Sequence, residues 1–305
     1  MRIIFFGTPD MAANILKSLI DAKVDIAAIV TKPDTPQGRS SKLIAPAVKQ
    51  LAQTLAPNVP ILQPIKCSSP EMLEVLKKYK ADLYVVVAYG EILSESLLAI
   101  PPHGAINVHF SLLPAYRGAA PFQRAIMNGE TETGISIIRL VKKMDAGDVI
   151  AAEKFVITND MTSGQLADVL CTIGTQCLFK VLDAFENNTV TFTPQDHSKA
   201  TFANKITIDE CRLDWNKPSR ELYNLVRALS PYPGAWCNVE IRGEKKRLKV
   251  FSAVPVDEPN TEDLVVACAQ GFLSLLTIQL EGKPKMQVRD FLRGLPASCI
   301  TFLPS

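Results

Sequence analysis

The sequence predicts an α/β fold: a doubly wound, mostly parallel, Rossmann-like sheet followed by a small β-barrel domain. In the first half of the 305-residue chain, short apolar runs alternate with amphipathic ones, which is the rhythm of βαβ units. Beyond about residue 206 the pattern changes to short strand-like runs broken by glycine, proline and charge, which is typical of a small barrel. The length fits two domains at roughly 100–200 residues each.

The strands and helices of the predicted sheet follow one another along the first half of the chain. Residues 2–6 form an apolar run that ends at Gly7 and predicts the first buried strand. Residues 83–88 are apolar on both faces, as a central parallel strand should be. Ser69 and Pro70 predict a helix start, because serine caps helices and proline suits the first helical position. The other elements predicted here are helices over 11–22, 69–79 and 121–128 and strands over 24–30, 60–62 and 105–108.

The remainder of the chain predicts a strand pair, a long helix and then the barrel. The strand pair covers 135–141 and 149–156, and the long helix covers 163–186. Residues 189–205 show little periodicity and predict a linker. We therefore expect a catalytic domain over 1–188, the linker over 189–205 and the barrel domain over 206–305. The barrel half is expected to contain a helix over 219–228 and strands over 235–241, 248–254, 264–269 and 273–280.

Composition excludes several classes of protein. The net charge is only +2, from 33 basic and 31 acidic residues, so any contact with nucleic acid must come from local patches. No apolar run approaches the ~18 residues of a membrane helix, and the N-terminal run is too short for a signal peptide. Seven scattered cysteines and three histidines show no metal-ligand spacing. We expect a reduced, cytoplasmic protein with no metal and no membrane contact.

A first strand that ends in glycine invites a dinucleotide-binding interpretation, which fails on detail. The turn after the strand begins Gly7-Thr8-Pro9 and lacks the GxGxxG pattern that allows close approach to a pyrophosphate. The second strand ends at Lys32 without an acidic residue for a ribose hydroxyl. The loop from 31 to 45 is long for a compact domain and carries Lys32, Arg39 and Lys42. Such loops are often functional, although a solvated surface insertion is the plain alternative.

The densest chemical signal is the run NVHFSLLPAYRGAAP over 107–121. Strand alternation puts Asn107 and His109 on one face, at the carboxyl edge where open α/β sheets bind ligands. Asp145, on a glycine-containing turn, is a natural third member. An amide and a protonated histidine can both donate to an oxyanion, and a carboxylate favours the charged histidine. The set fits acyl transfer by direct attack of an amine, although a histidine satisfied in the core is the common alternative.

These motifs resemble the folate-dependent formyltransferases. The resemblance rests on NVHFSLLPAYRGAAP together with six further stretches, and it covers the chain from Arg2 to about Lys285. The further stretches narrow it to the branch that acts on initiator tRNA; they are IIFFGTPDMAA, TKPDTPQGRSSKL, VVVAYGEIL, MDAGDVI, FANKITIDECRLDW and RALSPYPGAW. The resemblance implies transfer of the formyl group of 10-formyltetrahydrofolate to the α-amine of methionyl-initiator tRNA, without a metal.

The resemblance also implies roles for individual residues. Asn107 and protonated His109 would stabilise the oxyanion, while Asp145 would orient and charge His109 and assist proton removal. Asp148 is the competing carboxylate and is expected to shape the turn. The residues implied for folate are Ser111, Leu112, Leu113, Pro114, Tyr89, Gly90, Glu91 and Leu93. The residues implied for tRNA are Arg39 and Lys42 in the loop and Lys245, Lys246 and Arg247, together with Arg242 and Lys249, in a barrel that resembles an OB fold. Phe110 departs from the family, which usually has a small residue there.

Other functions remain open from the sequence. One alternative is a formyltransferase acting on a sugar-nucleotide or another small amine, or a hydrolase of 10-formyltetrahydrofolate. A second is a non-catalytic RNA-binding module that uses the barrel and the loop, which leaves the set of Asn107, His109 and Asp145 unexplained. The barrel's charge run is equally well read as a solvated hairpin. We expect a monomer.

Overall fold

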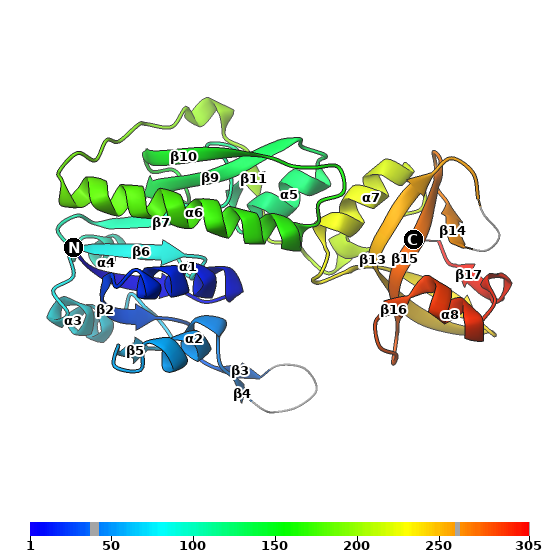
Figure 1. Ribbon diagram of the computed structural model, residues 1–305, viewed down its shortest axis with the longest axis horizontal. Helices are drawn as coiled ribbons and strands as arrows, with labels where there is room; N and C mark the ends of the chain where they lie inside the picture. The colour runs from blue at the N-terminus through cyan, green and yellow to red at the C-terminus, as the bar shows by residue number, and fades with distance from the viewer. Residues whose placement is uncertain (37–42, 260–262, 305) are drawn as a thin grey trace. The chain divides into compact units, whose positions relative to one another are not determined.

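The computed structural model describes residues 1–36, 43–259 and 263–304, and its contacts group these residues into two compact units (Figure 1). The first unit comprises Met1–Ala119, Gly134–Phe155 and Ala167–Ala203. The second comprises Ala120–Thr133, Val156–Leu166 and Asn204–Ser305. Two segments that precede Ala167 in the chain therefore belong to the C-terminal unit.

The first unit is built on a twisted, mostly parallel sheet. Its strand order is β5–β2–β1–β6–β7–β9–β10. Strand β1 pairs in parallel with β2 and β6, β2 with β5, and β6 with β7, whereas β9 runs antiparallel to β7. The strands are β1 (Arg2–Gly7), β2 (Asp25–Val30), β5 (Ile61–Leu62), β6 (Leu83–Val87), β7 (Ala105–His109), β9 (Glu132–Arg139) and β10 (Val149–Val156).

Helices cover both faces of this sheet, as the prediction of a doubly wound fold requires. On one face α3 and α4 supply Met72, Leu76 and Leu97 to a core that includes Phe6 and Tyr84 of the sheet. On the other face α1 and α6 pack; a Cβ added at Gly174 of α6 would lie 3.2 Å from the Val108 side chain. The helices are α1 (Asp10–Asp21), α2 (Ala47–Leu55), α3 (Pro70–Lys78), α4 (Glu95–Leu98) and α6 (Ser163–Glu186).

The order in which the chain adds strands to the sheet reverses between β1 and β6. The chain moves from β1 outward to β2 and β5, then returns to place β6 and β7 on the other side of β1. Immediately beyond these strand ends, the Thr8 hydroxyl donates to the Tyr89 carbonyl over 2.8 Å. His109 is the last residue of β7, at the same edge. A reversal of this kind opens a crevice at the strand ends, which is the usual ligand position in open α/β sheets.

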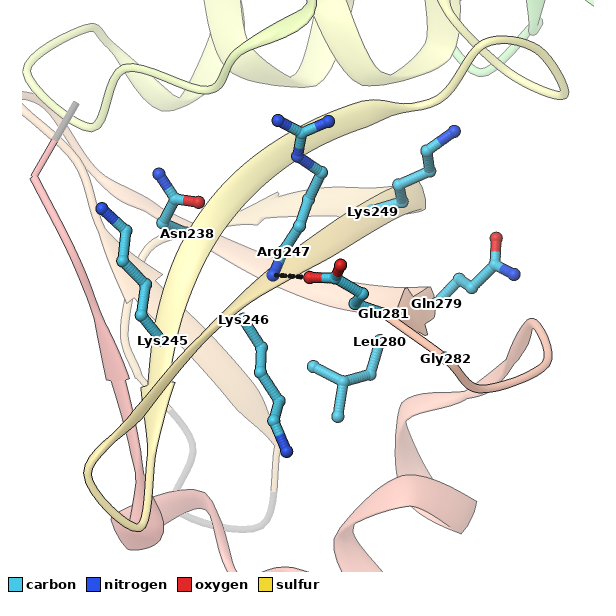
Figure 2. Close-up of a pocket in the computed structure, with 9 residues that line it drawn as sticks. All are labelled: Asn238, Lys245, Lys246, Arg247, Lys249, Gln279, Leu280, Glu281 and Gly282. Atoms are coloured by element: carbon cyan, nitrogen blue, oxygen red, sulfur yellow. Dashed lines mark hydrogen bonds between the residues drawn. The ribbon is translucent and has the colours of Figure 1, made fainter. Parts of the chain in front are cut away.

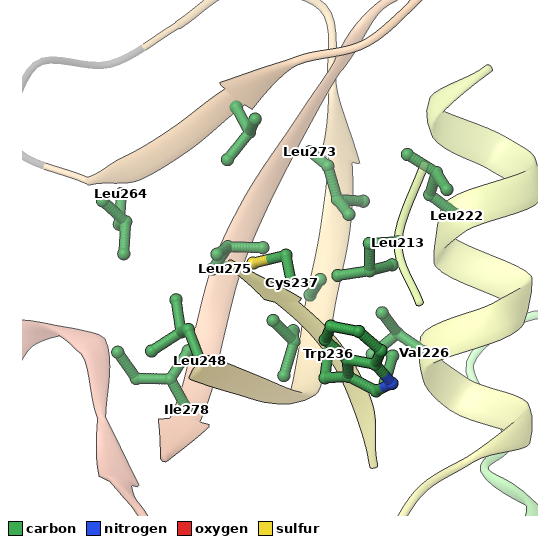
Figure 3. Close-up of a cluster of buried hydrophobic side chains, with 14 of the residues drawn as sticks. Leu213, Leu222, Val226, Trp236, Cys237, Leu248, Leu264, Leu273, Leu275 and Ile278 are labelled. Atoms are coloured by element: carbon green, nitrogen blue, oxygen red, sulfur yellow. The ribbon is translucent and has the colours of Figure 1, made fainter. Parts of the chain in front are cut away.

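The second unit is a curled antiparallel barrel with helices packed against it. Strands are ordered β14–β15–β13–β12–β17, and β16 pairs with β15. Its core joins Leu248, Leu273 and Leu275 of the strands to Leu222 and Val226 of α7 (Figure 3). Each such fully buried side chain contributes about 1.5–3 kcal/mol to stability. The elements are α5 (Pro121–Met127), α7 (Ser219–Ala228), β12 (Ala235–Ile241), β13 (Glu244–Val256), β14 (Leu264–Ala267), β15 (Phe272–Leu280), β16 (Met286–Gln287), α8 (Val288–Gly294) and β17 (Ile300–Phe302).

Helix α5 comes from the first half of the chain but packs on α7 of the second unit. Arg124 of α5 bonds to the Glu210 carboxylate, with 2.7 Å between Nη1 and Oε1. Hydrogen bonds from Arg124 and from the Thr207 backbone lower the pKa of Glu210 to about 2. The ion pair therefore persists at ordinary pH and ties α5 to the segment that leads into the barrel.

Pairs of two-residue strands also form in segments for which the sequence predicts no regular secondary structure. Strands β3 (Thr35–Pro36) and β4 (Leu43–Ile44) pair antiparallel across the insertion loop. Strand β8 (Arg117–Gly118) pairs in parallel with β11 (Phe202–Ala203), which belongs to the segment predicted as a linker. The predicted domain boundaries stay a prediction. Within the described ranges, no helix combines the length and apolar character needed to cross a membrane.

Candidate active site

Strand β7 presents the first two predicted catalytic residues at the carboxyl edge of the sheet. Asn107 pairs in register with Val86 on one side and Ile138 on the other. His109 lies two residues further along, on the same face, and is 4% exposed. Asn107 is half-buried, and its amide has no hydrogen-bond partner within the described part of the chain. The Asn107 amide is thus available to a ligand.

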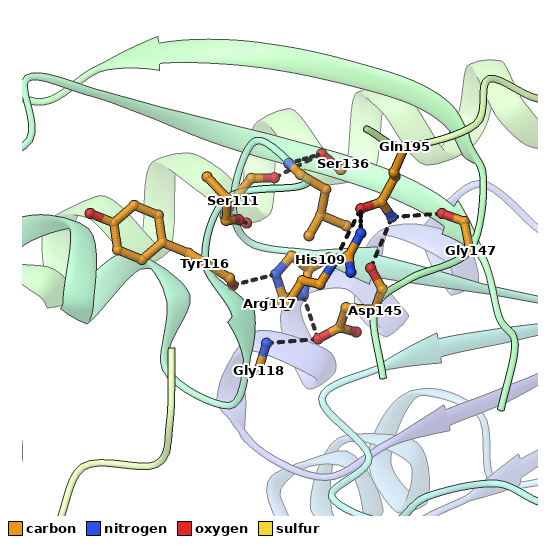
Figure 4. A network of polar contacts seen from close by, with 11 residues as sticks. His109, Ser111, Tyr116, Arg117, Gly118, Ser136, Asp145, Gly147 and Gln195 are labelled. Carbon is orange, nitrogen blue, oxygen red and sulfur yellow. Dashed lines mark hydrogen bonds and ion pairs between the residues drawn. The ribbon is translucent and has the colours of Figure 1, made fainter. Parts of the chain in front are cut away.

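Both ring nitrogens of His109 face oxygen atoms (Figure 4). Nε2 lies 3.0 Å from the Tyr116 carbonyl oxygen, and Nδ1 lies 3.7 Å from Oδ2 of Asp145. A neutral imidazole can donate from only one nitrogen, so the lone pair on its other nitrogen would face an oxygen without a hydrogen bond. The imidazolium can donate to both. Because Nε2 is already hydrogen-bonded, Nδ1 is the nitrogen that a substrate can share with Asp145.

Burial opposes this preference for the charged ring. Complete burial lowers the pKa of His109 below its ordinary value, while the charge of Asp145 and the Tyr116 carbonyl raise it. The Arg117 guanidinium lowers it further. With burial as the largest effect, the resting ring is neutral near pH 7. Additional negative charge nearby would favour the protonated ring.

Asp145 reaches the site from the turn between β9 and β10. Its backbone has φ +48°, a left-handed conformation that is uncommon for a residue other than glycine. The Gly118 N–H donates to its Oδ2 over 2.8 Å, on the same oxygen that faces His109. Asp148, the competing carboxylate, offers its backbone carbonyl to the Arg139 N–H over 2.9 Å. Asp145 is therefore the carboxylate of this turn that faces His109.

The loop after β7 is held from the neighbouring strand β9. Ser136 of β9 donates to the Ser111 carbonyl over 2.8 Å and accepts from the Leu113 N–H over 3.0 Å. The Ser111 hydroxyl donates to the Ala115 carbonyl over 2.6 Å. These bonds fix the predicted folate stretch of Ser111, Leu112, Leu113 and Pro114. Phe110, the residue at which the chain departs from the family pattern, is buried.

The loop after β6 is fixed by groups from two other segments of the first unit. Glu91 accepts from Lys32 at the end of β2 over 2.6 Å and from the Cys67 N–H over 2.9 Å. Tyr89 is buried, so it offers backbone groups, and Gly90 has φ +85°, which favours glycine. Glu91 and Leu93 also border a hollow of about 540 Å³, which His109 does not line. Its lining residues are Lys66, Ser68, Glu91, Ile92, Leu93, Ser94, Glu95, Ser96 and Lys142.

The barrel carries a second hollow, of about 640 Å³, with a basic lining (Figure 2). Lys245, Lys246 and Arg247, all predicted for tRNA, line it together with Lys249 from the same strand β13. The Arg247 guanidinium stacks on the Trp236 ring at 4.1 Å from the ring centroid. One acidic side chain, Glu281, also lines the hollow. Arg39 and Lys42 lie outside the described residues.

Residues 1–182 match the family model described as formyl transferase, and residues 205–296 match its C-terminal domain. A methionyl-tRNA formyltransferase from Protochlamydia amoebophila is 44% identical over 313 residues, covering 99% of this chain and 98% of that protein. The chain belongs to the methionyl-tRNA formyltransferase family. The corresponding protein of Ruminiclostridium cellulolyticum is 37% identical and covers 96% of each chain.

Solved structures extend the likeness of this methionyl-tRNA formyltransferase family member to HypX and to a sugar formyltransferase, at the level of fold alone. HypX from Aquifex aeolicus aligns with a TM-score of 0.68 at 17% identity, covering 100% of this chain. The chain spans 49% of the length of that protein. WlaRD, a sugar 3N-formyl transferase solved with dTDP and 5-N-formyl-THF, aligns with a TM-score of 0.67 at 18% identity, covering 93% and 99% of the two chains. The expected two-part α/β and barrel architecture is thereby confirmed.

Sequence reasoning missed three residues that hold the candidate site of this family member. Ser136 fixes the loop after β7, while Gln195 and Arg117 hold the turn that carries Asp145. Arg117 stands in the run that carries the resemblance and is 1% exposed, but a sequence gives no sign that an arginine is buried. Gln195 stands in a stretch without periodicity. Ser136 lies in a short apolar run with Ile135, Ile137 and Ile138 on β9, and a fully buried strand could have been inferred from that run.

Proposed function

We propose that the chain transfers the formyl group of 10-formyltetrahydrofolate to the α-amino group of methionyl-initiator tRNA, as a monomeric, cytoplasmic enzyme of translation initiation. The observation that carries the proposal is 44% identity over 99% of the chain to a protein named for this activity. The meeting of His109 and Asp145 at the carboxyl edge of the sheet supports the same chemistry.

The residues of the site divide the reaction between charge stabilisation and proton transfer. The amine nitrogen bonds to the formyl carbon, and the formyl oxygen gains negative charge. Asn107 donates to this oxygen from its unengaged amide, and His109 donates from Nδ1. Negative charge at the formyl oxygen favours the imidazolium, which both flanking oxygens stabilise.

Asp145 transfers the proton that leaves the amine during the reaction. The amine loses a proton, N10 of the folate gains one, and the bond from the formyl carbon to N10 breaks. Asp145, with its neighbour His109, accepts the first proton and returns one to N10, so atoms and charge balance over the cycle. No serine or cysteine nucleophile takes part, because the amine attacks the formyl carbon directly.

The folate would lie along the loops that follow β6 and β7. Support comes from the bonds that fix Ser111–Pro114 and Glu91, and from the hollow that Glu91 and Leu93 border. Related folds have been solved with tetrahydrofolic acid (HypX) and with 5-N-formyl-THF (WlaRD). Tyr89 and Gly90 would contribute backbone groups. The reaction that we propose uses the folate as a cosubstrate, and no step in it calls for a metal.

Replacing Arg39 and Lys42 together by alanine should impair the use of tRNA and spare the folate. Two cations in the insertion loop are expected to hold the acceptor end of the tRNA. We expect KM for the charged tRNA to rise about tenfold, because each lost phosphate contact weakens binding and its salt dependence. Steady-state kinetics with each substrate varied in turn makes the measurement. Unchanged KM and kcat for tRNA would discard the role of the loop.

Replacing Lys245 and Lys246 together by alanine should weaken tRNA binding mainly at low salt. If these side chains neutralise two phosphates, log Kd should depend less steeply on log salt, by a slope of about 1 to 2. Filter binding or fluorescence titration across salt concentrations gives the slope. Lys17→Ala is the matched control, an exposed lysine on α1 paired with Asp21. An unchanged slope would identify the charge run as a solvated hairpin.

Incubation with 10-formyltetrahydrofolate and charged initiator tRNA tests the function directly. Uncharged tRNA and a dTDP-linked aminosugar run in parallel, because WlaRD, of similar fold, is a sugar formyltransferase. We expect formylmethionyl-tRNA to be the product. Formylation of the aminosugar alone would favour the alternative substrate, and release of formate alone would favour a hydrolase.

A further inference from the structure

Gln195 is a buried polar residue in an otherwise exposed stretch of chain. Over residues 186–202, all of which the structure describes, it is the one buried residue, at 8% exposure. Its neighbours Pro194 and Asp196 are exposed. A side chain that leaves such a stretch to enter the interior must gain from specific contacts, since burying an unpaired amide is costly.

The Gln195 amide makes four hydrogen bonds, which is all that an amide can make (Figure 4). Its Oε1 accepts from Nε and Nη2 of Arg117 over 3.1 and 2.5 Å. Its Nε2 donates to the carbonyls of Asp145 and Gly147 over 2.8 and 2.6 Å. Arginine only donates and carbonyls only accept, so the partners fix which end of the amide is which.

The two carbonyls that Gln195 holds belong to the turn that presents Asp145. The turn leaves Asp145 in the left-handed region, and Gly147 lies so near β9 that an added Cβ would be 1.8 Å from the Arg139 carbonyl oxygen. A strained turn of this kind persists only where its surroundings hold it. Gln195 supplies two of the bonds that do so.

The other partner of Gln195 belongs to the segment that contacts the side chains of both His109 and Asp145. The Tyr116 carbonyl accepts from His109, and the Gly118 N–H donates to the Asp145 carboxylate. Arg117, between them, is 1% exposed, and among the described residues Gln195 is what links its guanidinium to the Asp145 turn. Gln195 thereby joins the two chain segments whose separation sets the distance from Nδ1 of His109 to Asp145.

We propose that Gln195 is a positioning residue, which holds the Asp145 turn against the 116–118 segment so that the carboxylate stays in reach of His109. Its own atoms do not touch the reacting groups. The expected effect of Gln195 on the rate rests on the proposed function of Asp145. Its effect on the position of Asp145 relative to His109 does not depend on the substrate.

Two substitutions test whether Gln195 positions the Asp145 turn or only accepts hydrogen bonds from the buried Arg117. Gln195→Glu keeps an acceptor for Arg117 but turns a carboxylate oxygen towards two carbonyls. Gln195→Met removes all four bonds. If Gln195 positions Asp145, both variants lose about 100-fold in kcat, with KM for each substrate changed by less than about threefold, because a displaced catalytic group affects the transition state. Activity near wild type in Gln195→Glu would overturn the proposal and leave only a role in pairing Arg117.

A double mutant shows whether the effect passes through Asp145. In an Asp145→Asn background, Gln195→Met should lower kcat by no more than about twofold, since residues that act as a unit are not additive. A full further loss of about 100-fold would mean that Gln195 acts elsewhere. His197→Ala is the matched control; it removes the other contact of Arg117, 2.9 Å away, from an exposed position and leaves the turn intact. It should keep kcat within about twofold.

Titration of His109 by NMR tests the geometry without any turnover. The protein has three histidines, so the ring signals are few. Moving Asp145 away removes an interaction that raises the pKa of His109, so this pKa should fall in Gln195→Met, which adds no charge, and stay unchanged in His197→Ala. A wild-type protein without formylation activity would refute the proposed function alone. An unchanged pKa of His109 in Gln195→Met would refute the positioning role, whatever the activity.

Discussion

Asn107→Ala and His109→Ala should each lower kcat by about 100-fold or more, the usual loss when one donor to an oxyanion is removed. Both side chains lie on one face of β7, at the edge where the formyl group is expected. The Asn107 amide is unengaged within the described chain, and Nδ1 of His109 is 3.7 Å from Asp145. The loss should fall on kcat, because charge on the formyl oxygen exists only in the transition state and the intermediate.

Single-turnover kinetics with saturating folate and charged tRNA is the measurement. Matched controls are Asn58→Ala and His103→Ala, which change exposed residues of the same types within the first unit. Both controls should keep the wild-type rate. Rates near wild type in Asn107→Ala and His109→Ala together would remove the proposed mechanism, because no other pair on this face of β7 has been assigned to the oxyanion.

Asp145→Asn should lower kcat by roughly 10²- to 10⁴-fold, the range associated with loss of a general acid or base. The amide keeps the size of the side chain but carries no charge and does not take up a proton at neutral pH. It also removes an interaction that raises the pKa of His109, a pKa that burial already lowers. The imidazolium is therefore less populated at any given pH, so the variant loses both a proton acceptor and part of a charged donor.

Asp148→Asn provides the control from the same turn, since Asp148 contributes its backbone carbonyl to β9. It should keep kcat within about threefold, as a substitution away from the reacting groups does. Kinetics across pH, together with NMR titration of His109, makes the comparison. The reverse ranking, with Asp148→Asn inactive and Asp145→Asn active, would show that the wrong carboxylate has been assigned.

Periodic segments could be predicted from the sequence because burial selects their residues at regular spacing. Helix α7 and strand β12 begin and end at the residues expected from their apolar patterns. Strand β13 is longer than expected, by Glu244–Arg247 at its start, because charged residues pair in the hairpin with β12 although they carry no apolar signal. The pairing of β8 with β11 could not be foreseen, since a two-residue strand has no period.

The candidate site divides in the same way. Asn107 and His109 could be placed on one face because alternation is a local rule. The glycine-containing turn pointed to Asp145 as a third member, and the resemblance implied its role. The approach of Asp145 to His109 depends on the strand order, which no local pattern shows. Gln195 bonds to residues 78 and 50 positions away in sequence, and nothing local distinguishes it from its exposed neighbours.

The placement of α5 and of residues 156–166 in the C-terminal unit affects how this chain can be divided or recombined. A fragment ending near residue 188 would leave the apolar side of α5 without α7, and Arg124 without Glu210. If residues 204–305 were replaced by the barrel of a relative, that barrel would have to pack against residues 120–133 and 156–166 of this chain. Chimeric enzymes that exchange only the C-terminal third would therefore have mismatched contacts inside the second unit. Exchanging all three of its segments together would preserve those contacts.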